Sequence, residues 1–197
     1  MDKIMIFDTD LNTDYYKKKI LSKEISIIKK YSPTNYYGEI TDGSTGLGYE
    51  SLTSRFSHFN VLEWWGTKKL KKIIKKNYQK YFESNISPIY VQCWANVMRK
   101  GQQIKPHSHR DDESTRYYSA LSGNLVIDVD EESYTFYENT PIVNKIGRMV
   151  LFPSNITHHT SLYNGSSVRV TVAFDIRNHK DWKEDIFDDF KSHWIKI

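Results

Sequence analysis

The sequence of 197 residues contains one cysteine, and its apolar runs are short. Cys93 cannot form a disulfide within the chain, which fits a reducing compartment. The longest apolar runs, such as Met149–Phe152, are far too short to span a bilayer. The first residues include acids and lack the basic start, apolar segment and cleavage site of a secretory signal. We therefore expect a cytoplasmic protein without a membrane span.

A large excess of one charge is also absent, since 28 Lys and Arg oppose 24 Asp and Glu. Much of the net charge of +4 is local, with seven lysines and no acid between Lys68 and Lys80. These lysines fill the polar side of an amphipathic helix predicted over residues 67–84, with Thr67 as its cap. Its apolar stripe consists of Leu70, Ile73, Ile74, Tyr78, Tyr81 and Phe82. A solvated helix face explains this run, and the sequence gives no strong nucleic-acid signal.

The length and the apolar content of 39% favour one domain over residues 1–197. In the N-terminal part, residues 1–87, the apolar spacing predicts a strand at Ile4–Phe7 and a helix from Asp14 to about Tyr31. The apolar stripe of that helix is Ile20, Leu21, Ile25 and Ile28. Residues 32–55 carry four glycines and no helical periodicity, so we expect a loop that covers a site.

The character of the sequence changes after Pro88. Short β-branched and aromatic runs, separated by Gly, Asn and Asp, are typical of a β-sandwich or barrel. They predict strands at residues 89–98, 117–129, 133–137, 148–153 and 167–176. In residues 179–197, an apolar spacing of four predicts an amphipathic helix that packs on the body or across a dimer. The expected fold class is α+β, with a jelly-roll core over residues 88–178, N-terminal helices and this C-terminal helix.

Four of the seven histidines lie in two close pairs in the β-rich part. His107 and His109 are two residues apart, so on an extended segment they project to the same side and can face one ion. His158 follows the strand predicted at 148–153 and could provide a third ligand. Three ligands on one face leave positions open for substrate. Imidazole suits iron, zinc, copper and nickel, so the residue type alone does not choose the metal.

Residues 90–176 resemble the 2-oxoglutarate- and iron(II)-dependent oxygenases, and most closely a hydroxylase branch of marine bacteria and their phages. The segments that carry the resemblance are Gln92-Cys-Trp94-Ala-Asn96, Lys105-Pro-His107-Ser-His109, Leu151-Phe152-Pro153, His158 and Val168-Arg169-Val-Thr171. The resemblance implies a double-stranded β-helix that holds Fe(II), with 2-oxoglutarate as cosubstrate and O2 as oxidant. It leaves the substrate open between a small molecule and a protein side chain.

The resemblance also implies a cosubstrate site around Arg169. In similar enzymes such an arginine binds the distal carboxylate of 2-oxoglutarate, a hydroxyl at the place of Thr171 is a second donor, and Asn96 would be a further polar contact. A guanidinium suits this role because its planar fork matches a carboxylate with two charge-assisted hydrogen bonds. Strand alternation places Arg169 on one face with Thr171 and Ala173, while Val168 and Val170 take the other face.

The third metal ligand stays open between His109, Asp111 and Glu113. The usual motif of the oxygenases is His-x-Asp/Glu…His, and His109 stands where the acid belongs, although His109-x-Asp111 offers another register. The spacing also resembles the cupins, in which Glu113 would be a fourth ligand. A cupin-like metalloenzyme, an isomerase or a dioxygenase without cosubstrate, is therefore an alternative function. A non-enzymatic metal-binding barrel is another.

Overall fold

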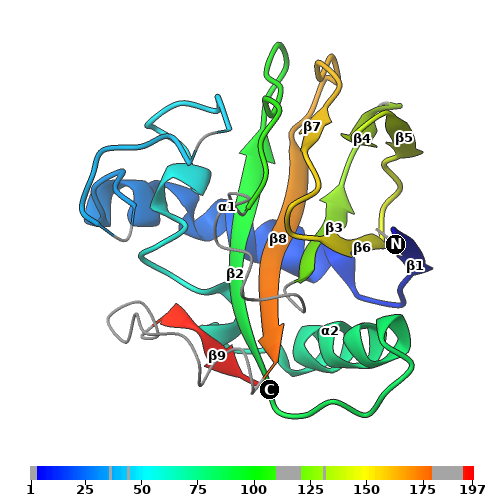
Figure 1. Ribbon diagram of the computed structural model, residues 1–197. Helices are drawn as coiled ribbons and strands as arrows, with labels where there is room; N and C mark the ends of the chain where they lie inside the picture. Colours follow the sequence, from blue (N-terminus) through cyan, green and yellow to red (C-terminus); the bar gives the residue numbers. More distant parts are fainter. Residues whose placement is uncertain (1–3, 36, 44, 110–120, 131, 179–192) are drawn as a thin grey trace.

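A computed structural model describes residues 4–35, 37–43, 45–109, 121–130, 132–178 and 193–197 (Figure 1). Its α-helices are α1 (Thr13–Lys30) and α2 (Lys68–Tyr81), and its 3₁₀ helices are η1 (Thr53–Arg55) and η2 (Val61–Glu63). Its strands are β1 (Met5–Asp8), β2 (Ile89–Met98), β3 (Leu121–Asp128), β4 (Tyr134–Tyr137), β5 (Thr140–Val143), β6 (Arg148–Pro153), β7 (His158–Thr160), β8 (Arg169–Asn178) and β9 (Ile195–Lys196). No helix in these residues is long and apolar enough to cross a membrane.

The strands form two antiparallel sheets, which agrees with the predicted α+β class. The large sheet has the order β1-β6-β3-β8-β2-β9, and the small sheet has the order β5-β4-β7. The bounds predicted for β2 and β6 agree with the structure, but β5 was not predicted. It contains Pro141 and is mostly exposed, so it lacks the apolar alternation that marks a strand. The predicted C-terminal helix falls largely on residues outside the described part of the chain, which resumes at His193 and ends in β9.

Helix α1 crosses behind β2, β8 and β3 (Figure 1). Its buried face is rotated slightly from the predicted stripe. Asn12 begins the helix by accepting a hydrogen bond from the backbone N–H of Tyr15 at 3.2 Å. Tyr16, Ile20 and Ile27 are buried, whereas Ile25 is 65% exposed. Including Ile25 in the buried stripe was therefore wrong. The aromatic ring of Tyr16, rather than a fourth aliphatic residue, completes the apolar face.

Helix α2 lies within the predicted range and has Thr67 at its N-cap, as predicted. The backbone carbonyl of Thr67 accepts from the N–H of Lys71 at 3.0 Å. Its side chain makes no capping hydrogen bond, because its hydroxyl donates to the backbone carbonyls of Leu62 and Trp64 at 2.9 and 2.8 Å. Of the predicted stripe, Leu70, Ile74 and Tyr78 are fully buried. The hydroxyl of Thr67 thus holds the turn before the helix instead of its first amide groups.

The two faces of β8 have opposite chemistry. Val170, Val172, Phe174 and Ile176 are buried in the main core, which also contains the inner faces of α1 and α2. The alternate residues Arg169, Thr171, Ala173 and Asp175 line a cavity on the other side. A smaller core joins Tyr137 and Ile142 of the small sheet to Val150 and Phe152 of β6. The sheet therefore separates a packed core from a polar site.

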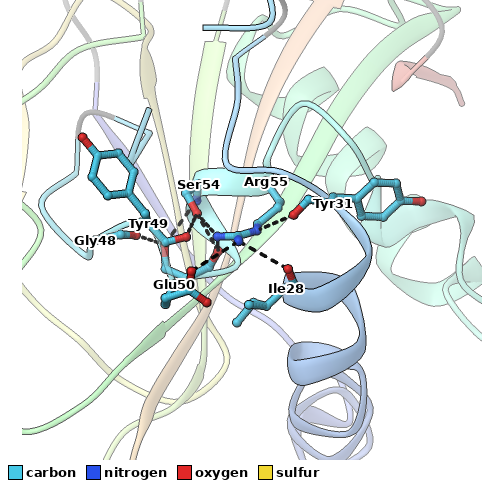
Figure 2. A network of polar contacts seen from close by, with 8 residues as sticks. Ile28, Tyr31, Gly48, Tyr49, Glu50, Ser54 and Arg55 are labelled. Carbon is cyan, nitrogen blue, oxygen red and sulfur yellow. Dashed lines mark hydrogen bonds and ion pairs between the residues drawn. The ribbon is translucent and has the colours of Figure 1, made fainter. Parts of the chain in front are cut away.

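Arg55 anchors the glycine-containing loop between α1 and β2 (Figure 2). Its side chain is 3% exposed. It donates to the backbone carbonyls of Ile28 and Tyr31 at the end of α1, and to the carbonyl of Ser51 and the hydroxyl of Ser54 in the loop. These bonds satisfy helix-end carbonyls that have no partner within the helix. Arg55 thereby ties the loop to the end of α1.

Candidate metal centre

A cavity of about 410 Å³ lies on the polar face of the large sheet. Its volume is in the range of sites that bind small ligands. One wall comes from the loop after α1, through Asn35, Thr41 and Thr45, which agrees with the expectation that this loop covers a site. The six site residues predicted from the sequence all line this cavity: Asn96, His107, His109, His158, Arg169 and Thr171.

His107, His109 and His158 are close enough together to hold one metal ion. One ring nitrogen of each histidine lies within 4.8 Å of the corresponding atoms of the other two. The backbones of His107 and His158 exchange two hydrogen bonds of 3.1 and 2.9 Å, and the N–H of His109 donates to the carbonyl of Ser154 at 3.0 Å. His107 lies outside the named strands and forms an isolated bridge with His158 of β7. The bridge still aligns the two segments at the site.

Within the described part of the chain, the hydrogen bonds of the three histidine rings all involve Nδ1 and none involves Nε2. Nδ1 of His107 lies 2.9 Å from the carbonyl of Lys105, and Nδ1 of His158 lies 3.1 Å from the carbonyl of Ile156. Nδ1 of His109 lies 2.6 Å from Oδ1 of Asp175. These oxygens only accept hydrogen bonds, so each Nδ1 carries the proton and each Nε2 keeps a lone pair. Second partners of this kind orient the histidine ligands of metal sites.

Burial keeps two of the histidines uncharged at neutral pH. It lowers the pKa of His107 to about 4, and the neighbouring His109 acts in the same direction. Burial also lowers the pKa of His158 well below its ordinary value, again with His109 and His107 as further causes. A metal ion binds neutral imidazole, so no proton has to leave these rings before an ion enters.

Arg169 is a buried cation at the first position of β8, with 1% of its side chain exposed. Its Nη2 donates to Thr135 Oγ1 at 3.3 Å and to Asn144 Oδ1 at 3.2 Å. Its Nε is buried without a partner, and within the described residues no carboxylate forms an ion pair with it. Burial lowers the pKa of Arg169 to about 10, so the group is charged at neutral pH. The arrangement is open to an anionic ligand.

Asn96 and Thr171 lie side by side on adjacent strands near Arg169. Asn96 on β2 pairs with Thr171 on β8, and its Nδ2 donates to Thr171 Oγ1 at 3.3 Å. Thr53, in η1, donates to Asn96 Oδ1 at 2.6 Å. The loop that Arg55 anchors therefore also fixes the amide of Asn96 in the cavity wall.

The sequence analysis missed Asp175, and it left the choice between His109, Asp111 and Glu113 as a metal ligand open. Asp175 lies on the cavity face two residues after Ala173, so the alternation that placed Arg169 could have found it. The alternatives Asp111 and Glu113 lie outside the described residues. Among the residues that are described, His109 completes the group with His107 and His158.

Comparison with known proteins identifies the fold. No protein-family model matches the sequence, and no curated protein matches it either. The structure is similar to a prolyl-4-hydroxylase from Pseudomonas putida, with 11% identity and a TM-score of 0.55 over 90% of this chain and 94% of that one. It is similar to a collagen prolyl hydroxylase of Paramecium bursaria chlorella virus-1 in complex with 2-oxoglutarate, with 15% identity and a TM-score of 0.55 over 88% and 95% of the chains.

A third similar structure is a prolyl hydroxylase from Trichoplax adhaerens in complex with a peptide fragment of hypoxia inducible factor. It has 10% identity and a TM-score of 0.55 over 92% of this chain and 86% of that one. At these identities the likeness concerns the fold. The predicted jelly-roll arrangement is confirmed, and the chain has the double-stranded β-helix fold of 2-oxoglutarate-dependent prolyl hydroxylases.

Proposed function

We propose that the protein is a 2-oxoglutarate- and Fe(II)-dependent oxygenase, and that it hydroxylates its substrate. His107, His109 and His158 hold the Fe(II), and Arg169 binds the distal carboxylate of 2-oxoglutarate. Thr171 and Asn96 provide further polar contacts to the cosubstrate. The fold and the three-histidine group support an enzyme of this class.

The main support for the proposal is that Arg169 is buried without an anionic partner among the described residues. A fully buried guanidinium with an unpartnered Nε and no carboxylate from the described chain is expensive to maintain in an empty site. The distal carboxylate of 2-oxoglutarate supplies the missing anion, and it accepts charge-assisted hydrogen bonds. Since Arg169 and the three histidines line one cavity, a single ligand can reach both.

The histidine group fits the metal. One ring nitrogen of each histidine lies within 4.8 Å of those of the other two. Each ring is oriented by a hydrogen bond at Nδ1, so Nε2 would bind the metal. Fe(II), when bound, supplies the redox chemistry by which O2 oxidises 2-oxoglutarate and a C–H bond of the substrate. The protein would bind the distal carboxylate of the cosubstrate at Arg169 and its 2-oxo acid end at the metal held by the three histidines.

The substrate is a small molecule or a protein side chain. Two observations on other proteins favour the side chain: the similar structures include prolyl hydroxylases, and one of them was solved with a peptide. A cupin-like metalloenzyme without cosubstrate is a second candidate, because the described ligand set consists of imidazole alone. Such an enzyme would have no use for Arg169.

The test is an anaerobic titration of the metal-free protein with Fe(II) and then with 2-oxoglutarate. We expect the weak visible charge-transfer band of a chelated 2-oxo acid, and aerobic turnover of 2-oxoglutarate to succinate. Arg169→Met should bind Fe(II) but lose the band and the turnover. Arg148→Met, which removes a partly exposed arginine paired with Asp8, is the matched control and should keep both. Fe(II) binding without the band in the unaltered protein would favour the cupin-like alternative.

A further inference from the structure

The three histidines of the metal group differ in the hydrogen-bond partner of Nδ1. His107 and His158 bond neutral backbone carbonyls through Nδ1. His109 instead bonds a carboxylate, Oδ1 of Asp175, at 2.6 Å. Asp175 is the one carboxylate among the described residues that line the cavity. The side chains of His109 and Asp175 are 11% and 26% exposed, so the bond is partly shielded from solvent.

We propose that Asp175 is a positioning residue that supplies, through His109, the negative charge that the three-histidine centre lacks. The inference rests on the proposed function, because it takes the three histidines as ligands of Fe(II). It goes further by giving a role to a residue that does not contact the ion.

The charge of the ligand set is the first argument. His109 stands where the resemblance places an acidic ligand, so a centre of three neutral imidazoles carries one positive charge more than a set with a carboxylate. Asp175 returns one negative charge at a distance of one hydrogen bond from the ring. A carboxylate that accepts the Nδ1 proton of a ligating histidine makes the other ring nitrogen more basic and therefore a stronger ligand.

The fixed position of Asp175 is the second argument. Ser122 on β3 pairs with Asp175 on β8, and its hydroxyl lies 2.6 Å from Asp175 Oδ1. Ser122 Oγ also lies 3.0 Å from Ser154 Oγ, and both serines are buried. Ser122 Oγ also lies 2.9 Å from Nδ1 of His109. A carboxylate only accepts hydrogen bonds, so the hydroxyl of Ser122 is the donor to Asp175. Ser122, with Ser154 of the turn after β6 beside it, thus holds Asp175 next to His109.

The test compares the Fe(II) affinities of Asp175→Asn and the unaltered protein, measured anaerobically by competition with a chromophoric chelator. The asparagine oxygen can still accept the Nδ1 proton of His109, so the substitution removes mainly the charge. We expect the dissociation constant for Fe(II) to rise about 10- to 100-fold. Asp128→Asn, which removes a carboxylate that pairs with Lys17 away from the cavity, should leave it unchanged. Circular dichroism of the metal-free variants checks that both fold.

The double variant His109→Asp with Asp175→Asn separates a charge effect from a structural one. It moves the carboxylate into the ligand set, so it should bind Fe(II) more tightly than Asp175→Asn alone. It should also bind more tightly than His109→Asp alone, in which two carboxylates face each other. An Asp175 that only supports the fold would make the double variant weaker than either single one, and that result would overturn the inference.

The outcomes for the inference and for the proposed function are distinct. An Asp175→Asn protein with unchanged Fe(II) affinity overturns the role of Asp175 and leaves the proposed function standing. Fe(II) binding that depends on Asp175, without a band on addition of 2-oxoglutarate, overturns the cosubstrate and supports the role of Asp175. An unaltered protein that binds no Fe(II) overturns both.

Discussion

Replacing Arg169 by methionine should stabilise the metal-free protein while abolishing the binding of 2-oxoglutarate. Burial lowers the pKa of Arg169 from 12.5 to about 10, and each pKa unit corresponds to about 1.4 kcal/mol. The burial of this charge therefore destabilises the fold by up to about 3 kcal/mol. Since the pKa in the folded state stays near 10, this cost is present throughout the neutral range and declines only above that value.

Arg169→Met also removes the hydrogen bonds of the guanidinium, and their loss offsets only part of the stability gained by removing the buried charge. Nη2 makes two bonds, at 3.2 and 3.3 Å, each worth about 1 kcal/mol or less. The two acceptors stay satisfied without it, because Thr135 Oγ1 donates to Asn144 Oδ1 at 2.9 Å and Asn144 Nδ2 donates to Ser133 Oγ. We therefore expect a net gain of about 1 to 2 kcal/mol, or roughly 2 to 4 °C in Tm for each kcal/mol.

The assay is urea and thermal unfolding of metal-free Arg169→Met beside the unaltered protein and the control Arg148→Met. Saturating Fe(II) should stabilise both proteins. Adding 2-oxoglutarate at 100 times its Kd should then add about a further 2.7 kcal/mol to the unaltered protein and nothing to Arg169→Met. A folded Arg169→Met protein that is less stable than the unaltered one by more than about 1 kcal/mol would refute the reasoning. It would mean that the guanidinium is already satisfied in the empty site.

Two further predictions concern stability. The free energy of unfolding of the metal-free protein should fall by about 1 to 3 kcal/mol as the pH falls from 6.5 towards 4. The reason is that the histidines of the unfolded chain bind protons in this range, whereas folded His107 and His158 do not. Urea midpoints at pH 7.5 and 5 measure this loss, and an equal pH dependence in His107→Gln would contradict it. Arg55→Met should lower the free energy of unfolding by about 2 to 4 kcal/mol in the same urea assay. The substitution leaves buried carbonyls of α1 and the loop without hydrogen-bond donors (Figure 2). A loss as small as that of Arg148→Met would show that the contacts of Arg55 are dispensable.

The parts of the fold that the sequence predicted are those with strong apolar patterns. Residues 89–98 and 148–153 are strands at the predicted bounds, because each lies between two other strands of the large sheet and carries a nearly continuous run of buried residues. Strand β5 was not predicted, because three of its four residues are exposed and it lacks an apolar pattern. Thr67 is the N-cap residue as predicted, but its hydroxyl does not cap the helix. A hydroxyl can bond the preceding turn as well as the following helix, and tertiary packing decides between the two.

The site was predictable where strand alternation applies. Arg169 and Thr171 share the cavity face as the period of two requires, and Asp175 continues the same series. The grouping of His107 and His109 with His158 was predicted from the two histidine pairs and the resemblance, not from alternation along one strand. It depends on a bridge between His107 and His158, which lie about fifty residues apart in the sequence. Alternation along one strand follows from local geometry, whereas convergence of loops follows from the whole fold.

Two buried arginines show why burial alone does not identify a functional group. Arg55 and Arg169 are 3% and 1% exposed. The donors of Arg55 bond backbone carbonyls that need them, so the fold accounts for its charge. Among the described residues, the Nε of Arg169 has no partner and its Nη2 has only a hydroxyl and an amide oxygen, so the described part of the fold does not account for its charge. A buried cation without an anion from these residues lies in the same cavity as three neighbouring imidazoles. The proposed ligand, with a carboxylate at one end and metal-binding atoms at the other, would satisfy both.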